Sequence, residues 1–401
     1  MERDLSTNRK LEIPMSAPDL TDEERDAVMD VLQTRRLSMG PQTTAFEVAA
    51  ASLVGVKHGM AVSSGTAGLH LCIRAAGVQD ADWVITTPFS FVATGNVMLY
   101  ERAVPIFIDV DPVSGNLNAE LAKKAATDLF SGGSAAEGWL PRKGIHGDGK
   151  LKAIIPVDVF GQPANYDVMQ EIAETHNLAL IEDSCEAIGA EFNGQKAGSF
   201  GDAGIFAFYP NKQITTGEGG VIVTDRDDWA EKIRALRNQG RTPGDTWLDH
   251  TYLGYNYRMD EMSAALGGVQ LTRLDELLEK RAIVASLYAE GLKGMAGVET
   301  PVLLPSTSRM SWFVYVIRLD QGIDRAMVIR QLGEQGVPSR PYFSPIHLQP
   351  FYKEQFGYRE GDFPIAEDLG KRSLSIPFSG IMTQNQVEYV CGTLRDVLAN
   401  I

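Results

Sequence analysis

The strongest constraint on the fold is a regular alternation of short apolar runs and helical patterns over the first 225 residues. The apolar runs predict buried strands at Met60–Val62, Val84–Thr86, Val104–Val110, Ala153–Val157 and Leu178–Ile181. Helical patterns between the runs are typical of parallel strands joined by helical crossovers. A long helix is expected at about 260–290, followed by an alternating run at Trp312–Leu319. The chain is therefore predicted as α/β, with a large, mostly parallel, doubly wound domain at 13–260 and a smaller α+β C-terminal domain at 261–401.

Composition limits the class of protein further. The 401 residues are 44% hydrophobic and 22% charged, which is ordinary for a globular protein. A net charge of −15 without a Lys/Arg-rich run argues against a nucleic-acid partner. No run of about 18 apolar residues predicts a membrane span, and the charged N-terminus lacks the apolar core of a signal peptide. Three widely spaced cysteines without a CxxC pair indicate no disulfide framework and no metal site, so we expect a cytoplasmic protein.

One lysine stands out at the end of an apolar strand. The segment Gly204–Gly220 reads GIFAFYPNKQITTGEGG, with Lys212 between an apolar run and a glycine-rich turn. Because burying an ammonium group is costly, such a lysine is either a surface residue in a loop or an amine that forms a Schiff base with a carbonyl group. The spacing alone does not choose between these two interpretations.

A turn of small residues follows the first predicted strand. Ser63–Gly68 reads SSGTAG and opens a helix predicted at Leu69–Ala76. A strand that passes through such a turn into a helix N-terminus offers free N–H groups and a favourable dipole to an anion. The alternative is an ordinary Ser/Thr helix cap. The segment matches neither GxGxxG nor a GK[ST] phosphate loop.

An aromatic residue and an aspartate follow two other predicted strands. Phe91 comes after Val84–Thr86, where it can stack on a flat ring or simply join the core. Asp183 ends the strand at Leu178–Ile181, at the sheet edge where open α/β folds bind ligands, and can pair with a ring nitrogen or cap a helix. An anion site, a stacking aromatic, an aspartate and a lysine together are what pyridoxal 5′-phosphate (PLP) requires.

Five motifs carry a resemblance to a known family: SSGTAGLHL, PFSFVAT, IEDSCEAIGA, FYPNKQITTGEGG and LGYNYRMDEMSAALGGVQL. From about Ile13 to the C-terminus, the chain resembles the DegT/DnrJ/StrS family of PLP-dependent aminotransferases, which have the type I fold and act on nucleotide-linked keto sugars. The resemblance implies transfer of an amino group from L-glutamate to a keto sugar nucleotide, giving an amino sugar for polysaccharide (such as lipopolysaccharide), glycan or antibiotic biosynthesis. The TTGEGG tail is similar to that of members that aminate a 4-keto-6-deoxy sugar, and amination of a 3-keto sugar is the alternative.

The resemblance also implies roles for the residues in these motifs. Lys212 would form the Schiff base and move the proton, and Asp183 would pair with the pyridine nitrogen. Phe91 would stack on the ring, and Glu186 would lie near the cofactor 3-hydroxyl.

For the cofactor phosphate, the resemblance implies contacts from Gly65, Thr66 and Ala67. Members of the family commonly carry a phosphate-binding serine five residues before the lysine, whereas this chain has Ala207 there. One phosphate hydrogen bond is expected to be missing or supplied elsewhere, at a cost of about 0.5–1.5 kcal/mol.

The resemblance further implies a homodimer with active sites at the interface. Asn256 and Arg258, in the GYNYRM motif, would reach the cofactor phosphate of the partner subunit. Tyr342 and His347 would contact the sugar nucleotide.

Two other classes of function are compatible with parts of the pattern. A PLP-binding regulator without turnover is disfavoured because no DNA-binding segment or basic run precedes the fold. A sugar-nucleotide-binding protein or an NAD-type dehydrogenase is disfavoured because the chain lacks GxGxxG.

Overall fold

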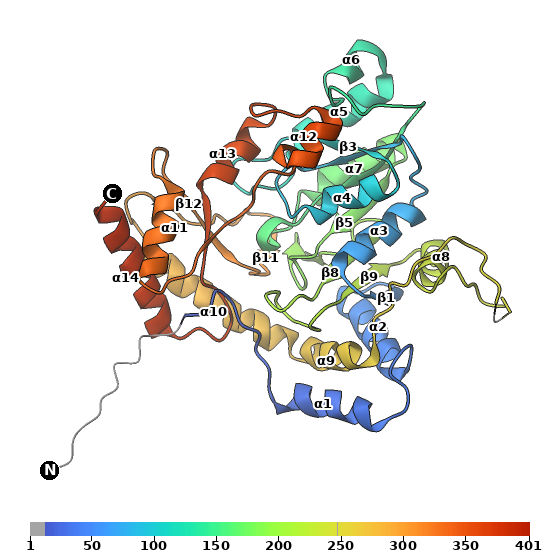
Figure 1. Cartoon of the computed structure of the whole chain (residues 1–401), viewed down its shortest axis with the longest axis horizontal. Coiled ribbons are helices and arrows are strands. Elements are labelled where there is room, and N and C mark those ends of the chain that lie inside the picture. Colours follow the sequence, from blue (N-terminus) through green and yellow to red (C-terminus); the bar gives the residue numbers. More distant parts are fainter. Residues whose placement is uncertain (1–12, 247) are drawn as a thin grey trace.

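A computed structural model describes residues 13–246 and 248–401 of the chain (Figure 1). Its centre is a seven-stranded sheet with the order β1-β9-β8-β5-β4-β2-β3. The strands are β1 (His58–Val62), β2 (Trp83–Thr86), β3 (Val104–Phe107), β4 (Leu151–Ile155), β5 (Ala179–Asp183), β8 (Ala203–Ala207) and β9 (Gly220–Thr224). Strand β9 runs antiparallel to β1 and β8, and the remaining neighbours in this sheet are parallel.

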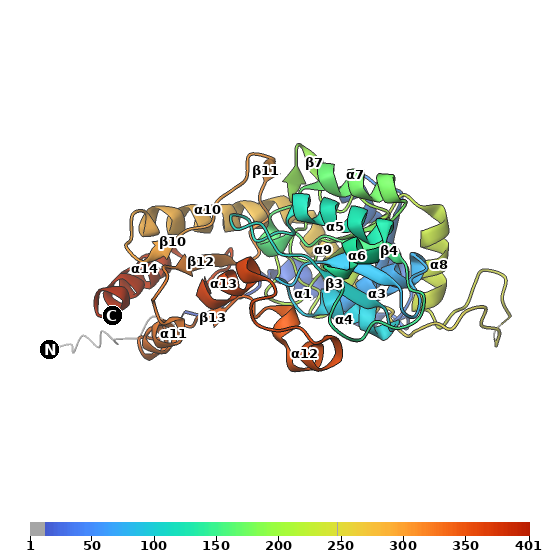
Figure 2. The same cartoon turned by 90° about the horizontal axis from the view of Figure 1, so that it is seen from above.

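Helices cover both faces of the sheet (Figure 2). One face carries α3 (Gly65–Ala75), α4 (Ala93–Tyr100) and α8 (Asp227–Arg237), and the other carries α2 (Pro41–Val54), α5 (Ala119–Ser131), α7 (Tyr166–His176) and α9 (Glu261–Thr272). The strands are buried on both sides, which explains their nearly continuous apolar sequences. This architecture confirms the predicted α/β class.

A second, smaller sheet lies toward the C-terminus. Its order is β10-β12-β14-β13, with antiparallel neighbours, and it packs against α10, α11 and α14. These elements are β10 (Val298–Glu299), β12 (Tyr315–Leu319), β13 (Arg340–Pro341), β14 (Ser373–Ile376), α10 (Leu274–Leu292), α11 (Arg325–Glu334) and α14 (Gln384–Ala399). Shorter or peripheral elements are α1 (Asp22–Gln33), α6 (Gly133–Glu137), α12 (Pro350–Phe356), α13 (Pro364–Arg372), β6 (Glu191–Phe192), β7 (Gln195–Lys196) and β11 (Thr307–Arg309).

The single long helix expected at about 260–290 is two helices, α9 and α10, which meet at Arg273. In the sequence, the pair Gly267-Gly268 indicates a bend within this helix, but the chain stays helical there. Gly267 serves close packing instead, because a Cβ at this position would lie 2.7 Å from the Phe46 ring. The helix is therefore interrupted at Arg273, whose side chain forms ion pairs with Asp19 and Glu24.

Three other expectations have different outcomes. The dipeptide Asn193-Gly194 predicts a hairpin turn, and the structure confirms it as β6–β7. The apolar run Val302–Leu304 predicts a strand, but this segment lies outside the sheets. The two prolines in residues 1–20 predict an extended arm, most of which lies in residues 1–12, outside the described residues. Among the described helices, none is long and apolar enough to cross a membrane.

Candidate active site

A cavity of about 520 Å³ lies at the carboxyl edge of the large sheet. Residues that follow β2, β4, β5 and β8 reach it, because the C-terminal ends of parallel strands share one edge. Seven of the residues predicted from the sequence line this cavity: Gly65, Thr66, Phe91, Asp183, Glu186, Lys212 and Tyr342. Segments far apart in the chain thus converge on one site of a size that suits a small ligand.

The N-terminus of α3 forms one end of the cavity. Ser64 caps the helix, and its Oγ accepts a hydrogen bond of 3.1 Å from the Ala67 N–H. Gly65 and Thr66 occupy the first two helical positions, where N–H groups have no acceptor within the helix. The structure therefore offers Gly65 and Thr66 to an anion, whereas the Ala67 N–H that was predicted to join them is already committed to the cap.

Glycine at position 65 allows α3 to approach the strand ends closely. A Cβ there would lie 2.7 Å from the Ala207 Cβ and 2.8 Å from the Cys185 Sγ, distances that ordinary Cβ atoms do not show. A larger residue would push the helix terminus away from β5 and β8. The anion site is thus built into the packing between helix and sheet.

Asp183 lies at the end of β5 and faces the same cavity. Its side chain is buried, and Oδ2 accepts a 2.6 Å hydrogen bond from the Thr94 hydroxyl while Oδ1 accepts one of 3.3 Å from the Cys185 N–H. These two donors hold the carboxylate in place. Thr94 escaped the sequence reasoning because only the tertiary fold brings α4 against β5. Phe91 lies nearby, 62% exposed, with its ring available to a flat ligand.

Lys212 projects into the cavity between a carboxylate and an aromatic ring. Its Nζ lies 3.5 Å from Glu186 Oε1 and 3.9 Å from the centroid of the Phe313 ring. Burial raises the pKa of Glu186, and the nearby Lys212 ammonium opposes this effect. Glu186 is also held by a 2.9 Å hydrogen bond from the Phe160 N–H. Phe313 was expected only as a strand residue, and nothing in its local sequence indicates a contact with the lysine.

His347 does not reach the cavity, contrary to the contact expected for it. Its side chain is fully buried, with Nε2 3.0 Å from Glu367 Oε1 and the ring packed edge-on against Phe363. Burial lowers its pKa, and Glu367 opposes this effect. The aromatic, proline-rich segment around it is part of the core, so His347 contributes to packing and does not contact a ligand in the cavity. Tyr342, from the same segment, does line the cavity.

Asn256 and Arg258 also lie outside the cavity of their own chain. Asn256 is exposed, and Arg258 donates a 3.0 Å hydrogen bond to Asn238 Oδ1. Both side chains belong to the loop that precedes α9. Their predicted role concerns a partner subunit and stays a prediction.

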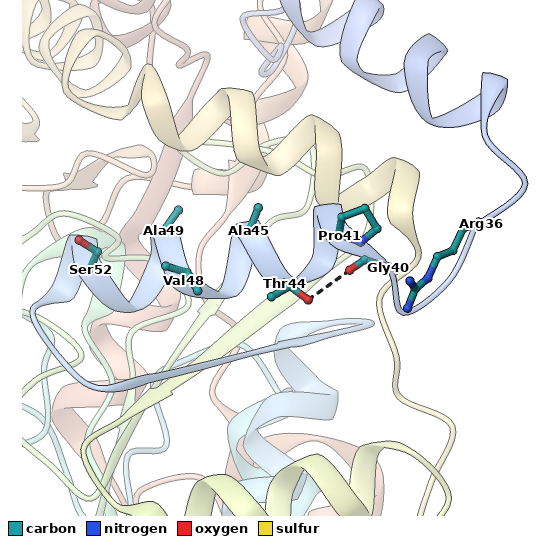
Figure 3. A pocket seen from close by; sticks show the side chains of 8 residues that line it. All are labelled: Arg36, Gly40, Pro41, Thr44, Ala45, Val48, Ala49 and Ser52. Carbon is teal, nitrogen blue, oxygen red and sulfur yellow. Dashed lines mark hydrogen bonds between the residues drawn. The ribbon is translucent and has the colours of Figure 1, made fainter. Parts of the chain in front are cut away.

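A different hollow lies along the outer face of α2 (Figure 3). It is open and mostly apolar, and it is lined by Arg36, Gly40, Pro41, Thr44, Ala45, Val48, Ala49 and Ser52. This set contains no carboxylate, histidine or lysine that could transfer a proton. The groove is therefore a surface feature and not a catalytic site.

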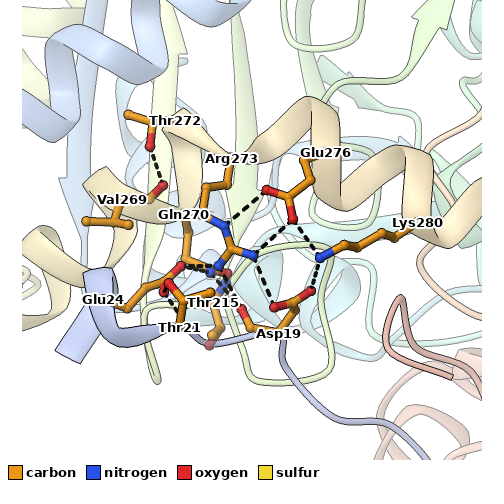
Figure 4. Close-up of polar contacts among 10 residues, drawn as sticks. All are labelled: Asp19, Thr21, Glu24, Thr215, Val269, Gln270, Thr272, Arg273, Glu276 and Lys280. Carbon is orange, nitrogen blue, oxygen red and sulfur yellow. Dashed lines mark hydrogen bonds and ion pairs between the residues drawn. The ribbon is translucent and has the colours of Figure 1, made fainter.

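A polar network on α9 and α10 supports the loop that follows Lys212 (Figure 4). Gln270 Oε1 accepts a 3.2 Å hydrogen bond from the Thr215 N–H, and its Nε2 donates one of 2.7 Å to Glu24. Arg273 binds the same Glu24 carboxylate at 2.6 Å and Asp19 at 3.1 Å. The network thus connects the N-terminal segment, the α9–α10 junction and the loop 208–219 between β8 and β9, which carries Lys212 and is called the lysine loop below.

The residues around the cavity fit PLP. The α3 N-terminus suits a phosphate, Asp183 suits a protonated ring nitrogen, and the exposed face of Phe91 suits a flat ring. Lys212 provides the amine that a carbonyl cofactor needs. When bound, PLP supplies an aldehyde that accepts amino groups and a ring that withdraws electrons.

Comparison with known proteins agrees with this fit. A model of the DegT/DnrJ/EryC1/StrS aminotransferase family matches residues 18–395. The chain belongs to this family, and it is a PLP-dependent aminotransferase with the type I fold. The family, fold and cofactor expected from the sequence are confirmed.

Among relatives, a GDP-perosamine synthase from Caulobacter vibrioides is 37% identical over 389 residues, covering 96% of this chain and 98% of the relative. The spore coat polysaccharide biosynthesis protein SpsC from Bacillus subtilis is 33% identical over 399 residues, with 96% and 97% covered. Among solved structures, Helicobacter pylori PseC, an aminotransferase involved in the biosynthesis of pseudoaminic acid, has a TM-score of 0.85 at 27% identity, covering 97% of this chain and 100% of that one.

Proposed function

We propose that this aminotransferase moves an amino group from L-glutamate to a keto sugar nucleotide, at the 4-keto carbon of a 6-deoxy sugar, to give an amino sugar. The observation that carries the proposal is the convergence of Lys212, Asp183 and the α3 N-terminus on one cavity. The names of the relatives support a sugar substrate, since they include a GDP-perosamine synthase and a coat polysaccharide protein. The TTGEGG segment after Lys212 supports the 4-keto position.

The cavity residues divide the work as follows. Lys212 would hold the cofactor through its amine and, in the free form, would act as the base that takes the α-proton of glutamate and as the acid that gives this proton back. Asp183 would pair with the ring nitrogen and keep it protonated, and the Thr94 hydroxyl holds this carboxylate in place. Glu186 lies within reach of Lys212 and can accept a hydrogen bond from it in its ammonium form. The keto sugar then receives the amino group through the same proton transfers in reverse.

We further propose that two copies of the chain form a cytoplasmic homodimer. Apolar side chains are exposed next to the α2 groove: Leu37 at 46%, Met39 at 40% and Val48 at 65%. A small hollow that adjoins the groove through Gly40 and Thr44 is lined by Arg258. A second copy that binds this face would bury these apolar residues. Asn256 and Arg258 of one copy would then lie near the phosphate end of the cavity in the other copy.

A spectrum and a substrate panel test the reaction. The purified protein should show a visible absorbance band from lysine-bound PLP that disappears when L-glutamate is added. Amino transfer is then measured with 4-keto and 3-keto sugar nucleotides carrying UDP, GDP or dTDP, with products identified by mass and NMR. Preferential use of a 3-keto sugar would overturn the position, and a band unchanged by glutamate would indicate a regulator without turnover.

Mixing inactive variants tests the shared site. Lys212→Ala and Arg258→Ala each lack one contribution, and a hybrid dimer would contain one intact site. Activity that returns on mixing supports the homodimer with shared sites. A monomer by analytical ultracentrifugation, or no return of activity from stable mixed dimers, would contradict it.

A further inference from the structure

A buried arginine lies behind the reactive lysine without a carboxylate partner. Arg281, on α10, is 3% exposed, and among the described residues no Asp or Glu forms an ion pair with it. Burial lowers its pKa to about 10. A buried charge costs several kcal/mol unless polar groups compensate it. The contacts that this guanidinium makes therefore indicate what it is for.

Main-chain carbonyls supply those contacts, and they come from two distant segments. One terminal nitrogen donates a 2.7 Å hydrogen bond to the Lys212 carbonyl. The other donates to the carbonyls of Trp312, at 3.3 Å, and Phe313, at 3.2 Å. A planar guanidinium can reach both segments at once, whereas a lysine ammonium is a single point charge.

These carbonyls belong to the residues that define the environment of the lysine amine. The main chain of Lys212 sets the origin of its side chain, and the main chain of Phe313 sets the ring that lies 3.9 Å from Nζ. Gln213 reinforces the same connection, because its Nε2 donates to the Ser311 carbonyl at 2.9 Å and to the Ser311 hydroxyl at 2.8 Å. Lys212 is thus linked to Trp312 and Phe313 through Arg281. Its neighbour Gln213 is linked directly to Ser311.

Arg281 also occupies the point where α10 passes from one core to the other. Before it, Leu277 and Leu278 pack with the apolar cluster beneath the large sheet. After it, Val284 and Tyr288 pack with the cluster of the small sheet. From this position, hydrogen bonds from Arg281 connect the lysine loop, which follows β8 of the large sheet, to the segment that leads into β12 of the small sheet.

We propose that Arg281 is a positioning residue of the aminotransferase reaction, which holds the main chains of Lys212 and Phe313 together and so aims the lysine amine. The inference rests on the role proposed above for Lys212. Gln270 holds the same loop three residues further along, through the Thr215 N–H, so both α9 and α10 support the lysine loop.

Three variants test this inference. Arg281→Met keeps an apolar side chain and removes the guanidinium group. Arg281→Lys keeps a positive charge but lacks the planar guanidinium that reaches both segments. Arg325→Met is the matched control, because Arg325 also donates to main-chain carbonyls, those of Gly370 and Ser373, but within the C-terminal part of the chain. All three are compared with the wild-type protein by thermal unfolding.

The first readout uses the cofactor-free protein. Amide hydrogen exchange should become faster in Arg281→Met for peptides that contain Lys212–Thr216 and Ser311–Val314, and stay at the wild-type rate there in Arg325→Met. Unchanged exchange in both segments would overturn the inference. Because this measurement needs no PLP, it remains informative if the assignment of Lys212 fails.

The second readout is the half-reaction with L-glutamate, followed by the loss of the visible band. A small misplacement of a reacting group can cost about 100-fold in rate, so we expect a 10- to 100-fold lower maximal rate in Arg281→Met with little change in KM. Arg281→Lys should remain slow. A wild-type rate of the half-reaction in Arg281→Met or in Arg281→Lys would show that the guanidinium is not needed to position Lys212. Should the methionine variant fail to fold, the lysine variant alone decides between these outcomes.

Discussion

The active-site cavity and the α9–α10 network both gather buried acids and bases, but they pair them differently. In the network, Glu24 meets Arg273 at 2.6 Å (Figure 4), and although burial alone would raise its pKa, hydrogen bonds from Thr21, Gln270 and Arg273 lower it to about 2. In the cavity, Lys212 and Glu186 are 3.5 Å apart, and burial raises the pKa of Glu186. The network thus pairs its charges closely in a structural role, whereas the cavity places Lys212 beside one carboxylate at a longer distance.

The largest difference between the two regions should come from Lys212→Ala. Loss of both the cofactor attachment and the proton carrier is expected to lower turnover by on the order of 10⁴-fold. The free energy of unfolding should change little, since Glu186 can take up a proton when its partner is gone. Turnover is measured with glutamate and the preferred keto sugar. Lys371→Ala, which removes an exposed ammonium that does not line the cavity, serves as the control, and near wild-type turnover in Lys212→Ala would exclude the lysine from catalysis.

Arg273→Met should have the opposite profile. Removal of Arg273 leaves the Glu24 carboxylate buried without its cation, so the free energy of unfolding is expected to fall by about 3–5 kcal/mol. The rate at saturating substrate should stay near that of the wild type while the protein is folded. Urea denaturation provides the measurement, and Lys280→Met, in a half-exposed part of the network, should cost no more than about 1 kcal/mol. A variant as stable as the wild type would contradict the structural role.

The two carboxylates should respond to pH in opposite directions. The folded pKa of Glu24 is about 2, below its ordinary value of 4.5, so its stabilisation is complete above pH 4.5 and is lost as the pH falls toward 2. The gap in unfolding free energy between the wild type and Glu24→Gln should therefore close over this window, by about 3 kcal/mol. The pKa of Glu186 is raised by burial, so its contribution to the free energy of unfolding changes with pH in the opposite direction.

For Glu186, the wild type should lose stability relative to Glu186→Gln as the pH rises above 4.5 and passes the folded pKa. Denaturation of the cofactor-free proteins across the pH range tests both cases. Parallel pH profiles for all three proteins would mean that neither carboxylate is perturbed as the structure indicates.

Features encoded locally could be predicted from the sequence. The strand runs, the turn before α3 and the aspartate at the end of β5 follow from periodicity and from where parallel strands end. The structure places Lys212, Asp183 and Gly65 at one sheet edge, as these local patterns indicate. Thr94 and Phe313 could not be predicted as neighbours of the site, because their contacts depend on which distant segments meet.

Errors arose where a local pattern has more than one tertiary solution. Gly267-Gly268 suggested a helix bend, but the glycine admits the Phe46 ring and the helix ends instead at Arg273. His347 was expected to contact the sugar nucleotide, yet its ring is buried in the core with Nε2 3.0 Å from Glu367 Oε1. In both cases burial by a distant partner decided the outcome.

The smallest effect is expected at Ala207, and it tests how complete the phosphate site is. Ala207 lines the cavity, and its Cβ lies 2.7 Å from where a Cβ on Gly65 would stand. A hydroxyl there would add one donor beside the α3 N-terminus, so Ala207→Ser should bind PLP about 2- to 10-fold more tightly, as expected for a single hydrogen bond. Gly65→Ala should bind it more weakly, because the added methyl group collides with Ala207 and Cys185. Both affinities are measured by titrating the cofactor-free proteins with PLP. Equal affinity in Ala207→Ser and the wild type would mean that the helix N-terminus and Thr66 already satisfy the phosphate without the serine.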